Sequence, residues 1–206
     1  MKEIPERTRN RLVTLARLLG QIKDERVTSA KISLLTGWSE SLIRRDISFL
    51  ELNCGSSNGY AVKDLHEKIS VALGISSAEK KIKCCIVGLG RLGAALLENS
   101  IFEGSPFEIV AGFDTNVNRT EVLRSTFPLH PASMLESVVQ KEGIEFAILA
   151  VPDSVAQDMA SRLAKTGING IANYTGAVLT LQEEVPVQNV SPVTALTNLL
   201  AEQRKN

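Results

Sequence analysis

The chain has 206 residues, which is enough for one large domain or two small ones. Its formal net charge is zero and 44% of its residues are apolar, yet no apolar run approaches the roughly 18 residues of a membrane span. The charged first 20 residues do not resemble a secretory signal, and three cysteines without a spaced pair predict neither disulfides nor a metal site, as in a reducing cytoplasm.

The charge is unevenly distributed along the chain. Residues 1–60 hold 10 Lys and Arg against 7 Asp and Glu, and the remainder holds 13 against 16. A mildly basic first third joined to a mildly acidic body is consistent with a nucleic-acid-binding domain at the start of the chain.

Three helices are predicted within the first 50 residues. The first runs from Ile4-Pro5 to about Ile22, and the second covers Ala30 to Leu35 after a turn at residues 24–26. Gly37 is a natural left-handed stop, and a third helix then covers Glu40 to Leu50.

The third helix has a polar outer face, and a serine at its start can cap it. These candidate DNA-binding residues are Ser39, Ser41, Arg44, Arg45 and Ser48. Arginine can bind guanine edges or phosphates, and serine can donate to phosphates. Two short helices around a tight glycine turn therefore predict a helix-turn-helix; the alternative is a small helical bundle whose charges face solvent.

A polar loop follows, from Asn53 to Asn58, between Leu52 and the run Tyr60-Ala61-Val62. It is typical of the tip of a hairpin or wing, and Tyr60 joins the candidate DNA-binding residues. An amphipathic linker helix is expected from Lys63 to Leu73, ending at Gly74, with a domain boundary near residue 78.

The centre of the chain holds a glycine-rich motif. Cys84 to Val87 is an apolar run that predicts a buried strand, and Gly88-Leu89-Gly90-Arg91-Leu92-Gly93 leads into a helix expected to reach Glu98. Gly88 permits a tight turn, Gly90 lets a pyrophosphate approach bare backbone, and Gly93 lets the helix lie close to the strand. A glycine-rich turn without a ligand is the alternative.

A second strand, Phe107 to Phe113, ends at Asp114, which lies 21 residues after Gly93. At this place a carboxylate accepts hydrogen bonds from the adenosine ribose and repels a 2′-phosphate, which favours NAD over NADP. Arg119 lies close enough in sequence to keep NADP open.

Strands and helices continue to alternate up to the end of the chain. The pattern predicts an α/β fold with a Rossmann-type, doubly wound parallel sheet. Asp153 is expected to cap one of the helices. The remaining elements are a helix over Leu135–Lys141, a strand over Phe146–Val151, a helix over Asp153–Lys165, strands over Gly167–Asn173 and Val185–Val190, and a helix over Pro192–Gln203.

No catalytic constellation is evident. The two histidines, His66 on the linker helix and His130 in a proline-flanked turn, are expected at the surface rather than in general acid catalysis. A chain that binds the dinucleotide without consuming it is therefore predicted, so not an enzyme. The alternatives are a small NAD(P)-dependent oxidoreductase, a DNA-binding relative that does not sense, and a sensor of another ligand.

The chain resembles the Rex family of bacterial redox-sensing repressors over nearly its whole length. The motifs that carry the resemblance are Ile4-Pro5, Arg11-Leu12, Ser39 with Ile43-Arg44-Arg45-Asp46-Ile47-Ser48, Gly59-Tyr60-Ala61-Val62, the strand and glycine motif Ile86 to Gly93, Ala111-Gly112-Phe113-Asp114, Ala150-Val151-Pro152 and Asn189-Val190.

This resemblance implies a cytoplasmic homodimer that binds a palindromic operator on double-stranded DNA and is released when NADH binds. Residues 1–78 would form a winged helix-turn-helix domain, 79–190 the NAD(H)-binding domain, and 191–206 a helix that crosses to the partner subunit. The strand end Ala150-Val151-Pro152 would lie along the ribose and nicotinamide half of the cofactor (NADH or NAD+). No membrane contact is implied.

The chain departs from the family pattern at several positions. Gly55-Ser56 stands where the wing usually carries a Lys-Arg pair, and Leu42 replaces a glutamine. Asn99 occupies the region of a sensing aromatic residue. Ser191 replaces an acidic residue whose ion pair with Arg11 is therefore lost, so the departures bear on the coupling between the two halves.

Overall fold

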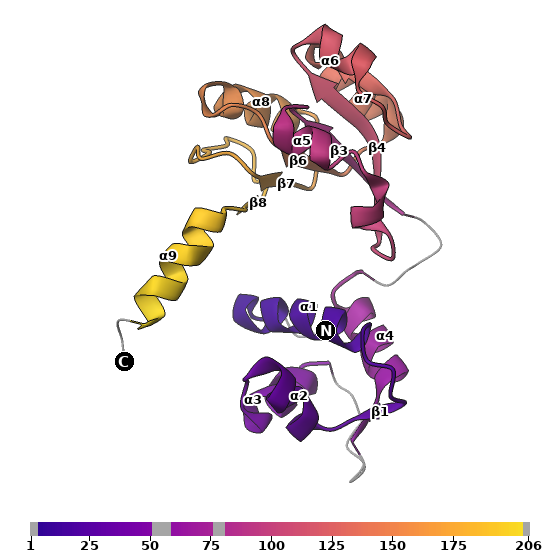
Figure 1. Cartoon of the computed structure of the whole chain (residues 1–206), viewed down its shortest axis with the longest axis vertical. Coiled ribbons are helices and arrows are strands. Elements are labelled where there is room, and N and C mark those ends of the chain that lie inside the picture. Colours follow the sequence, from indigo (N-terminus) through magenta and orange to yellow (C-terminus); the bar gives the residue numbers. More distant parts are fainter. Residues whose placement is uncertain (1–3, 51–58, 76–80, 204–206) are drawn as a thin grey trace. The chain divides into compact units, whose positions relative to one another are not determined.

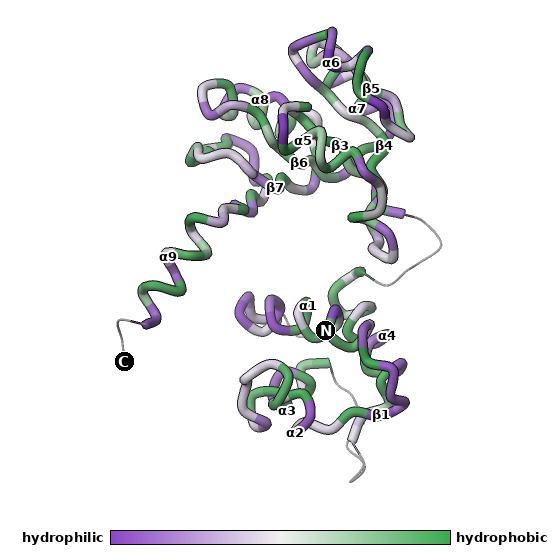
Figure 2. The backbone as a smooth tube through the Cα atoms, viewed as in Figure 1, coloured by the Kyte–Doolittle hydropathy of each residue, from purple (hydrophilic) through white to green (hydrophobic). Residues whose placement is uncertain are grey.

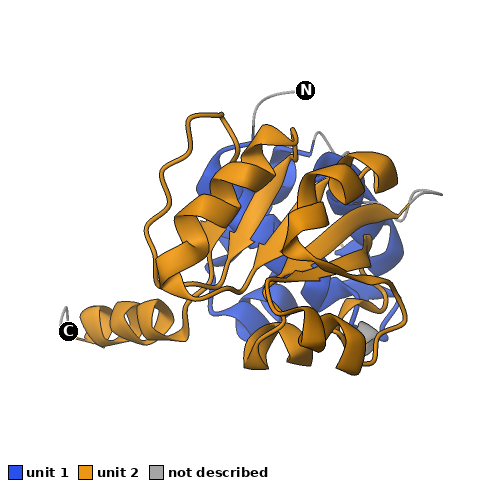
Figure 3. Cartoon of the chain, turned by 90° about the horizontal axis from the view of Figure 1, so that it is seen from above, with its two compact units in different colours: residues 1–79 blue, residues 80–206 orange. Residues whose placement is uncertain are grey.

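A computed structural model describes residues 4–50, 59–75 and 81–203 (Figure 1). The chain divides into two compact units, residues 1–79 and 80–206 (Figure 3). The expected wing tip, with Gly55-Ser56, lies outside the described residues.

Unit 1 contains four helices among its described residues. They are α1 (Glu6–Leu19), α2 (Ser29–Thr36), α3 (Glu40–Ser48) and α4 (Val62–Ala72). Two short strands, β1 (Arg26–Val27) and β2 (Tyr60–Ala61), pair antiparallel with Val27 opposite Tyr60. Residues 24–26 were predicted as a turn, so strand β1 was missed. Tyr60-Ala61 therefore pairs with the segment before α2.

Local signals in the sequence account for the turn between α2 and α3. The side chain of Thr28 accepts a hydrogen bond from Lys31 N at the start of α2. Gly37 ends α2 in the left-handed region at φ +74°, where L side chains are strained. Ser39 then caps α3 by accepting from Leu42 N at 3.3 Å, as predicted.

The core of unit 1 is apolar and draws on all four helices. Helix α4 was expected to be a linker, but Leu65 and Ile69 are buried against α1, so the helix belongs to this core. The other buried members are Leu12, Leu15, Ala16, Leu19, Val27, Ile32, Ile43, Ile47 and Val62.

Unit 2 is built on a six-stranded parallel sheet, which confirms the predicted α/β fold. The strand order is β5-β4-β3-β6-β7-β8. The first and fourth strands of the unit, β3 and β6, therefore lie side by side, and the order reverses between them as in a doubly wound sheet. The strands are β3 (Ile82–Val87), β4 (Phe107–Asp114), β5 (Leu129–Pro131), β6 (Phe146–Leu149), β7 (Gly170–Asn173) and β8 (Val187–Asn189). Strand β5, which contains His130, was not predicted.

Alternate side chains of β3 face opposite sides of this sheet. Cys85 and Val87 join a core with α7 (Leu135–Glu142) and α8 (Asp153–Lys165), whereas Cys84 and Ile86 join a second cluster with Leu97 and Phe127. The apolar strands stand out in Figure 2. The shorter elements are α5 (Arg91–Ala95), η1 (Asn99–Phe102), α6 (Val117–Val122) and η2 (Ala132–Met134).

The last described helix, α9 (Pro192–Gln203), has the predicted bounds. It contains no buried residue, and in Figure 1 it projects from the end of β8. Val193, Leu196, Leu199 and Leu200 expose between 51% and 71% of their surface. Their spacing of three and four residues forms one apolar stripe along the helix.

Candidate functional site

The glycine motif forms the turn between β3 and α5, and two of its glycines are required by the fold. Gly88 has φ +97°, and a Cβ there would lie 2.5 Å from the carbonyl oxygen of Ala150. A Cβ on Gly93 would lie 1.8 Å from the carbonyl oxygen of Gly88. The tight turn and the close helix that the sequence predicted are therefore both present, although α5 ends at Ala95 rather than near Glu98.

Gly90 differs from these two glycines. Its φ is −67°, which any residue can adopt, and apart from its two chain neighbours no described residue has an atom within 4 Å of an added Cβ. Neither backbone conformation nor packing within the chain requires glycine here, although glycine loses more conformational freedom on folding than any other residue. Bare backbone facing open space is what a pyrophosphate needs for close approach.

Asp114 ends β4 beside this turn and is only 5% exposed. Its Oδ2 accepts a hydrogen bond from Leu89 N at 2.7 Å, and its Oδ1 accepts one from Asn116 N at 2.7 Å. Arg119 Nη1 lies 3.3 Å from Oδ2 and forms an ion pair with it. Because a carboxylate offers about four acceptor positions, about one remains for a ligand.

A pocket of about 290 Å³ lies at the carboxyl ends of the strands. Gly88 and Gly90 line it together with Asp114 and the strand end Ala150-Val151-Pro152. The structure thus brings together residues that the sequence placed in three separate segments. Arg119, which the sequence placed near Asp114, also lines the pocket. The sequence missed the other lining residues, which are Val87, Phe113, Thr115, Ala132, Val155 and Met159.

Four residues of the predicted cofactor set are not among those lining the pocket. Leu89 is 2% exposed and packs in the second core cluster of unit 2, and Gly93 is buried under the turn. Arg91 and Leu92 are exposed on α5. Neither histidine lines the pocket: His130 lies on β5 with its ring 5.8 Å from that of Phe113.

Asp153 has another role than the expected helix cap. Pro152 occupies the cap position of α8, and Asp153 Oδ1 accepts a hydrogen bond from Gly176 N at 2.8 Å. One turn further along, Gln157 bonds to both the N–H and the carbonyl oxygen of Thr180. The loop after β7 is therefore attached to the first turns of α8, beside the pocket.

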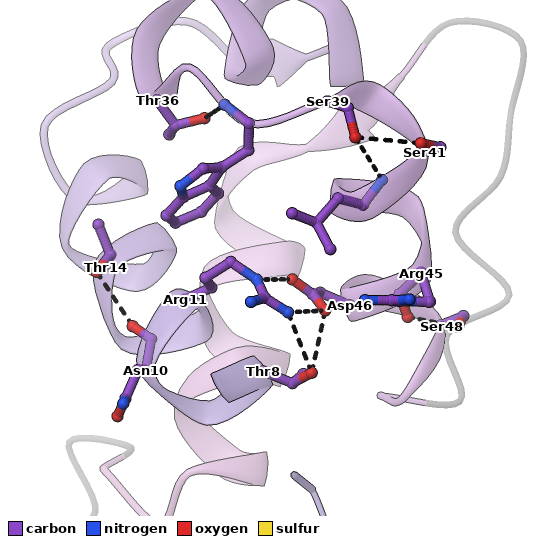
Figure 4. Close-up of polar contacts among 12 residues, drawn as sticks. Thr8, Asn10, Arg11, Thr14, Thr36, Ser39, Ser41, Arg45, Asp46 and Ser48 are labelled. Atoms are coloured by element: carbon purple, nitrogen blue, oxygen red, sulfur yellow. Dashed lines mark hydrogen bonds and ion pairs between the residues drawn. The ribbon is translucent and has the colours of Figure 1, made fainter. Parts of the chain in front are cut away.

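In unit 1, the polar face of α3 is exposed as predicted. Arg44 pairs with Glu40 one turn earlier. Ser39 Oγ lies 3.1 Å from Ser41 Oγ, as Figure 4 shows. Ser48 Oγ donates to the carbonyl oxygen of Arg45 at 2.6 Å. Tyr60 differs from these residues because it is partly buried and packs against the core of unit 1.

A buried ion pair on the opposite side of α3 was not predicted. Arg11 donates to both carboxylate oxygens of Asp46, at 2.5 and 2.8 Å, and Thr8 Oγ1 donates to Oδ1 at 3.1 Å (Figure 4). The side chain of Asp46 is 4% exposed and that of Arg11 is 20% exposed. The hydrogen bond to Asp46 raises the pKa of Arg11. Helix α1 therefore holds α3 through a charged, bidentate contact.

Comparison with known proteins identifies the family. The redox-sensing transcriptional repressor Rex of Limosilactobacillus reuteri (strain DSM 20016) is 31% identical over 202 residues, which cover 97% of this chain and 93% of that protein. The chain belongs to the Rex family. The Rex protein of Listeria welshimeri serovar 6b is 30% identical over 201 residues, covering 96% of this chain and 92% of the relative.

Solved structures of a Rex-family repressor, RSP, cover the whole of this Rex-family chain. RSP in complex with β-NAD+ and operator DNA matches with a TM-score of 0.87 and 25% identity over 94% of its own chain. RSP in complex with β-NADH matches with a TM-score of 0.83 and 26% identity over 96% of its chain. A family model described as a CoA binding domain matches residues 79–177. Membership of a repressor family confirms the prediction that the chain is not an enzyme.

The structure shows the local surroundings of two positions, 191 and 99, where this chain departs from the Rex pattern. Ser191 Oγ accepts a hydrogen bond from Thr194 N at 3.3 Å, so the serine caps α9. Arg11, whose acidic partner at 191 is absent, has Asp46 instead. Asn99 begins η1.

In the described ranges, no helix combines the length and the apolar character needed to cross a bilayer. The same residues contain no cluster of three or more His, Cys, Asp or Glu side chains able to hold a metal ion.

Proposed function

We propose that this Rex-family chain is a transcriptional repressor that binds operator DNA as a homodimer and is released when NADH binds. The observation that carries the cofactor half is Gly90, a glycine that the fold does not need, at the edge of a pocket containing a buried carboxylate. The operator complex of RSP supports the DNA half, because that structure resembles the whole chain.

The pocket residues divide the cofactor into two halves. Gly88 and Gly90 would face the pyrophosphate with bare backbone, and Asp114 would accept a hydrogen bond from the adenosine ribose. Ala150, Val151 and Pro152 would lie along the nicotinamide half. Leu89, Arg91, Leu92 and Gly93 would act by holding the shape of the turn. In this proposal NADH is an effector: its binding energy differs between the DNA-bound and free forms, and no bond in it is broken.

The exposed face of α3 would enter the major groove. Arg44 and Arg45 would contact guanine edges or phosphates, and Ser39, Ser41 and Ser48 would contact phosphates. Tyr60 would contribute from β2 near the wing. We assign residues 1–78 to the winged helix-turn-helix domain, 79–190 to the NAD(H)-binding domain and 191–206 to the dimerisation helix. The apolar stripe of α9 would be covered by the partner subunit in a protein that acts in the cytoplasm.

The proposal can be tested with purified full-length protein and a random duplex library. Selection should yield a palindromic site, since a two-fold dimer places its two recognition helices in successive major grooves. In a mobility-shift assay NADH should release that site, whereas NAD+ should not. Selected DNA that stays bound at saturating NADH would overturn the sensing half.

Two arginine variants separate base contacts from phosphate contacts. Arg44→Ala or Arg45→Ala should cost roughly 1–3 kcal/mol and relax specificity if the residue contacts a base, and should reduce the salt slope by about 1 if it contacts phosphate. Arg124→Ala, an exposed arginine of unit 2, is the charge-matched control. Unchanged operator binding by an Arg44→Ala, Arg45→Ala double variant would remove α3 from the DNA interface.

A further inference from the structure

The adenosine end of the pocket carries a cation as well as an anion. Asp114 is 5% exposed and already accepts three hydrogen bonds, two from backbone N–H groups and one from Arg119. Arg119 lines the pocket and keeps half of its side chain exposed. A ligand arriving at this end therefore meets the guanidinium at the surface and the carboxylate behind it.

The remaining hydrogen-bonding capacity belongs mainly to Arg119. A guanidinium has five N–H donors, and among the described residues Asp114 is the partner of one of them, at 3.3 Å. Among the described residues that line the pocket, the ionisable ones are Asp114 and Arg119, so none of these residues adds a second carboxylate that opposes an incoming anion. Asn116, the neighbour that donates its N–H to Asp114, is uncharged.

We propose that Arg119 is a specificity-determining residue that admits a phosphate on the adenosine ribose. This inference rests on the proposed NADH pocket and adds a ligand class to it: adenine nucleotides that carry a 2′- or 3′-phosphate. A carboxylate free to face the ribose repels such a phosphate. Here the carboxylate is buried and its charge is compensated by Arg119, whose planar donor fork matches a phosphate.

The experiment measures binding by calorimetry to the full-length protein. Half-ligands isolate the ribose phosphate, so adenosine 5′-monophosphate is compared with adenosine 2′,5′-bisphosphate and adenosine 3′,5′-bisphosphate. At least one bisphosphate should bind tenfold or more tightly than the monophosphate. Its identity distinguishes a 2′-phosphate, as in NADPH, from a 3′-phosphate, as in coenzyme A. NADH and NADPH are then titrated in parallel.

Variants assign the effect to Arg119. In Arg119→Ala the advantage of the bisphosphate should fall at least tenfold, while NADH affinity changes less than threefold because a ribose hydroxyl still has Asp114. Arg119→Lys should keep part of the advantage, since it keeps the charge and loses the fork. Arg124→Ala, which removes an exposed arginine that does not line the pocket, should bind all ligands as the parent does.

The outcomes separate this inference from the proposed function. If neither NADH nor NADPH binds, the cofactor pocket itself is wrong. If NADH binds but both bisphosphates bind no better than the monophosphate, only the role of Arg119 is overturned. An equal loss of NADH and bisphosphate binding in Arg119→Ala would also overturn it, because Arg119 would then merely hold Asp114 in place.

Discussion

Substitutions at Gly90 test whether this glycine is required for folding or for ligand binding. Gly90→Ala should leave unit 2 folded, because φ is −67° and nothing lies within 4 Å of the new Cβ. Removing glycine from a position that other residues can adopt stabilises a protein by about 0.4–1 kcal/mol through the unfolded chain. Gly93→Ala should do the opposite and prevent normal folding, since its Cβ would lie 1.8 Å from a carbonyl oxygen.

Gly90→Val should weaken NADH binding, because its branched side chain fills the space next to the turn. At an NADH concentration 100 times the dissociation constant, the parent protein should gain about 2.7 kcal/mol of stability. Gly90→Val should gain almost none, which corresponds to an affinity at least about 100-fold lower.

Thermal unfolding with and without NADH is the assay for these glycine variants. Gly20→Ala, at the end of α1 in unit 1, is the matched control and should respond to NADH as the parent does, because its Cβ makes only ordinary contacts at 3.5 Å and beyond. A Gly90→Val protein that responds to NADH like the parent, or one that is unfolded without NADH, would refute the assignment of the turn.

Three further predictions concern an ion pair in each unit and the thiols of strand β3. Asp46→Ala should lower the free energy of unfolding by about 3–5 kcal/mol in urea titrations, because it removes the partner of Arg11, whose side chain is only 20% exposed; a loss below about 1 kcal/mol would contradict this. The hydrogen bond from Arg162 lowers the pKa of Glu136, so Glu136→Gln should be less stable than the parent above the unfolded-state pKa of about 4.3, and this difference should disappear as pH falls through the folded-state pKa. A difference that is the same at pH 3 and pH 7 would exclude the linkage. Burial raises the pKa of Cys84 to about 12, so a Cys54→Ser variant should show no thiol that reacts with Ellman's reagent at pH 8 while folded, and two in denaturant.

Where the signal is local, the sequence predicts the structure closely. Ser39 and Gly37 each act through their own backbone neighbours, so the turn between α2 and α3 could be located from residue types alone. Helix α9 begins at Pro192, where the missing N–H costs nothing, and its bounds match the prediction. The order of strand, glycine motif, helix and acid in unit 2 likewise needs only periodicity and spacing.

Features that depend on residues far apart in the chain could not be predicted from local sequence patterns. Strand β5 has three residues, one of them proline, and exists because β4 offers it an edge. The spacing of Asp114 predicted its place at the end of β4 but could not show that Leu89 N and Arg119 already occupy its oxygens. Aspartate is a residue type that often caps helices, yet the carboxylate of Asp153 accepts a hydrogen bond from the N–H of a glycine 23 residues later.

Because Arg11 pairs with Asp46, the absence of an acid at position 191 does not leave Arg11 without a counter-charge. With only the family pattern in view, the missing acid at 191 leaves Arg11 without a counter-charge, and an uncompensated arginine that is four-fifths buried would be costly. Asp46 supplies that counter-charge within unit 1 through two hydrogen bonds, and Thr8 adds a third contact to the carboxylate. The orientation of α3 on α1 is thus held without residue 191. Ser191→Asp should therefore leave the stability of unit 1 unchanged in urea titrations, and a clear gain in its free energy of unfolding would show that Arg11 still lacks part of its counter-charge without an acid at 191.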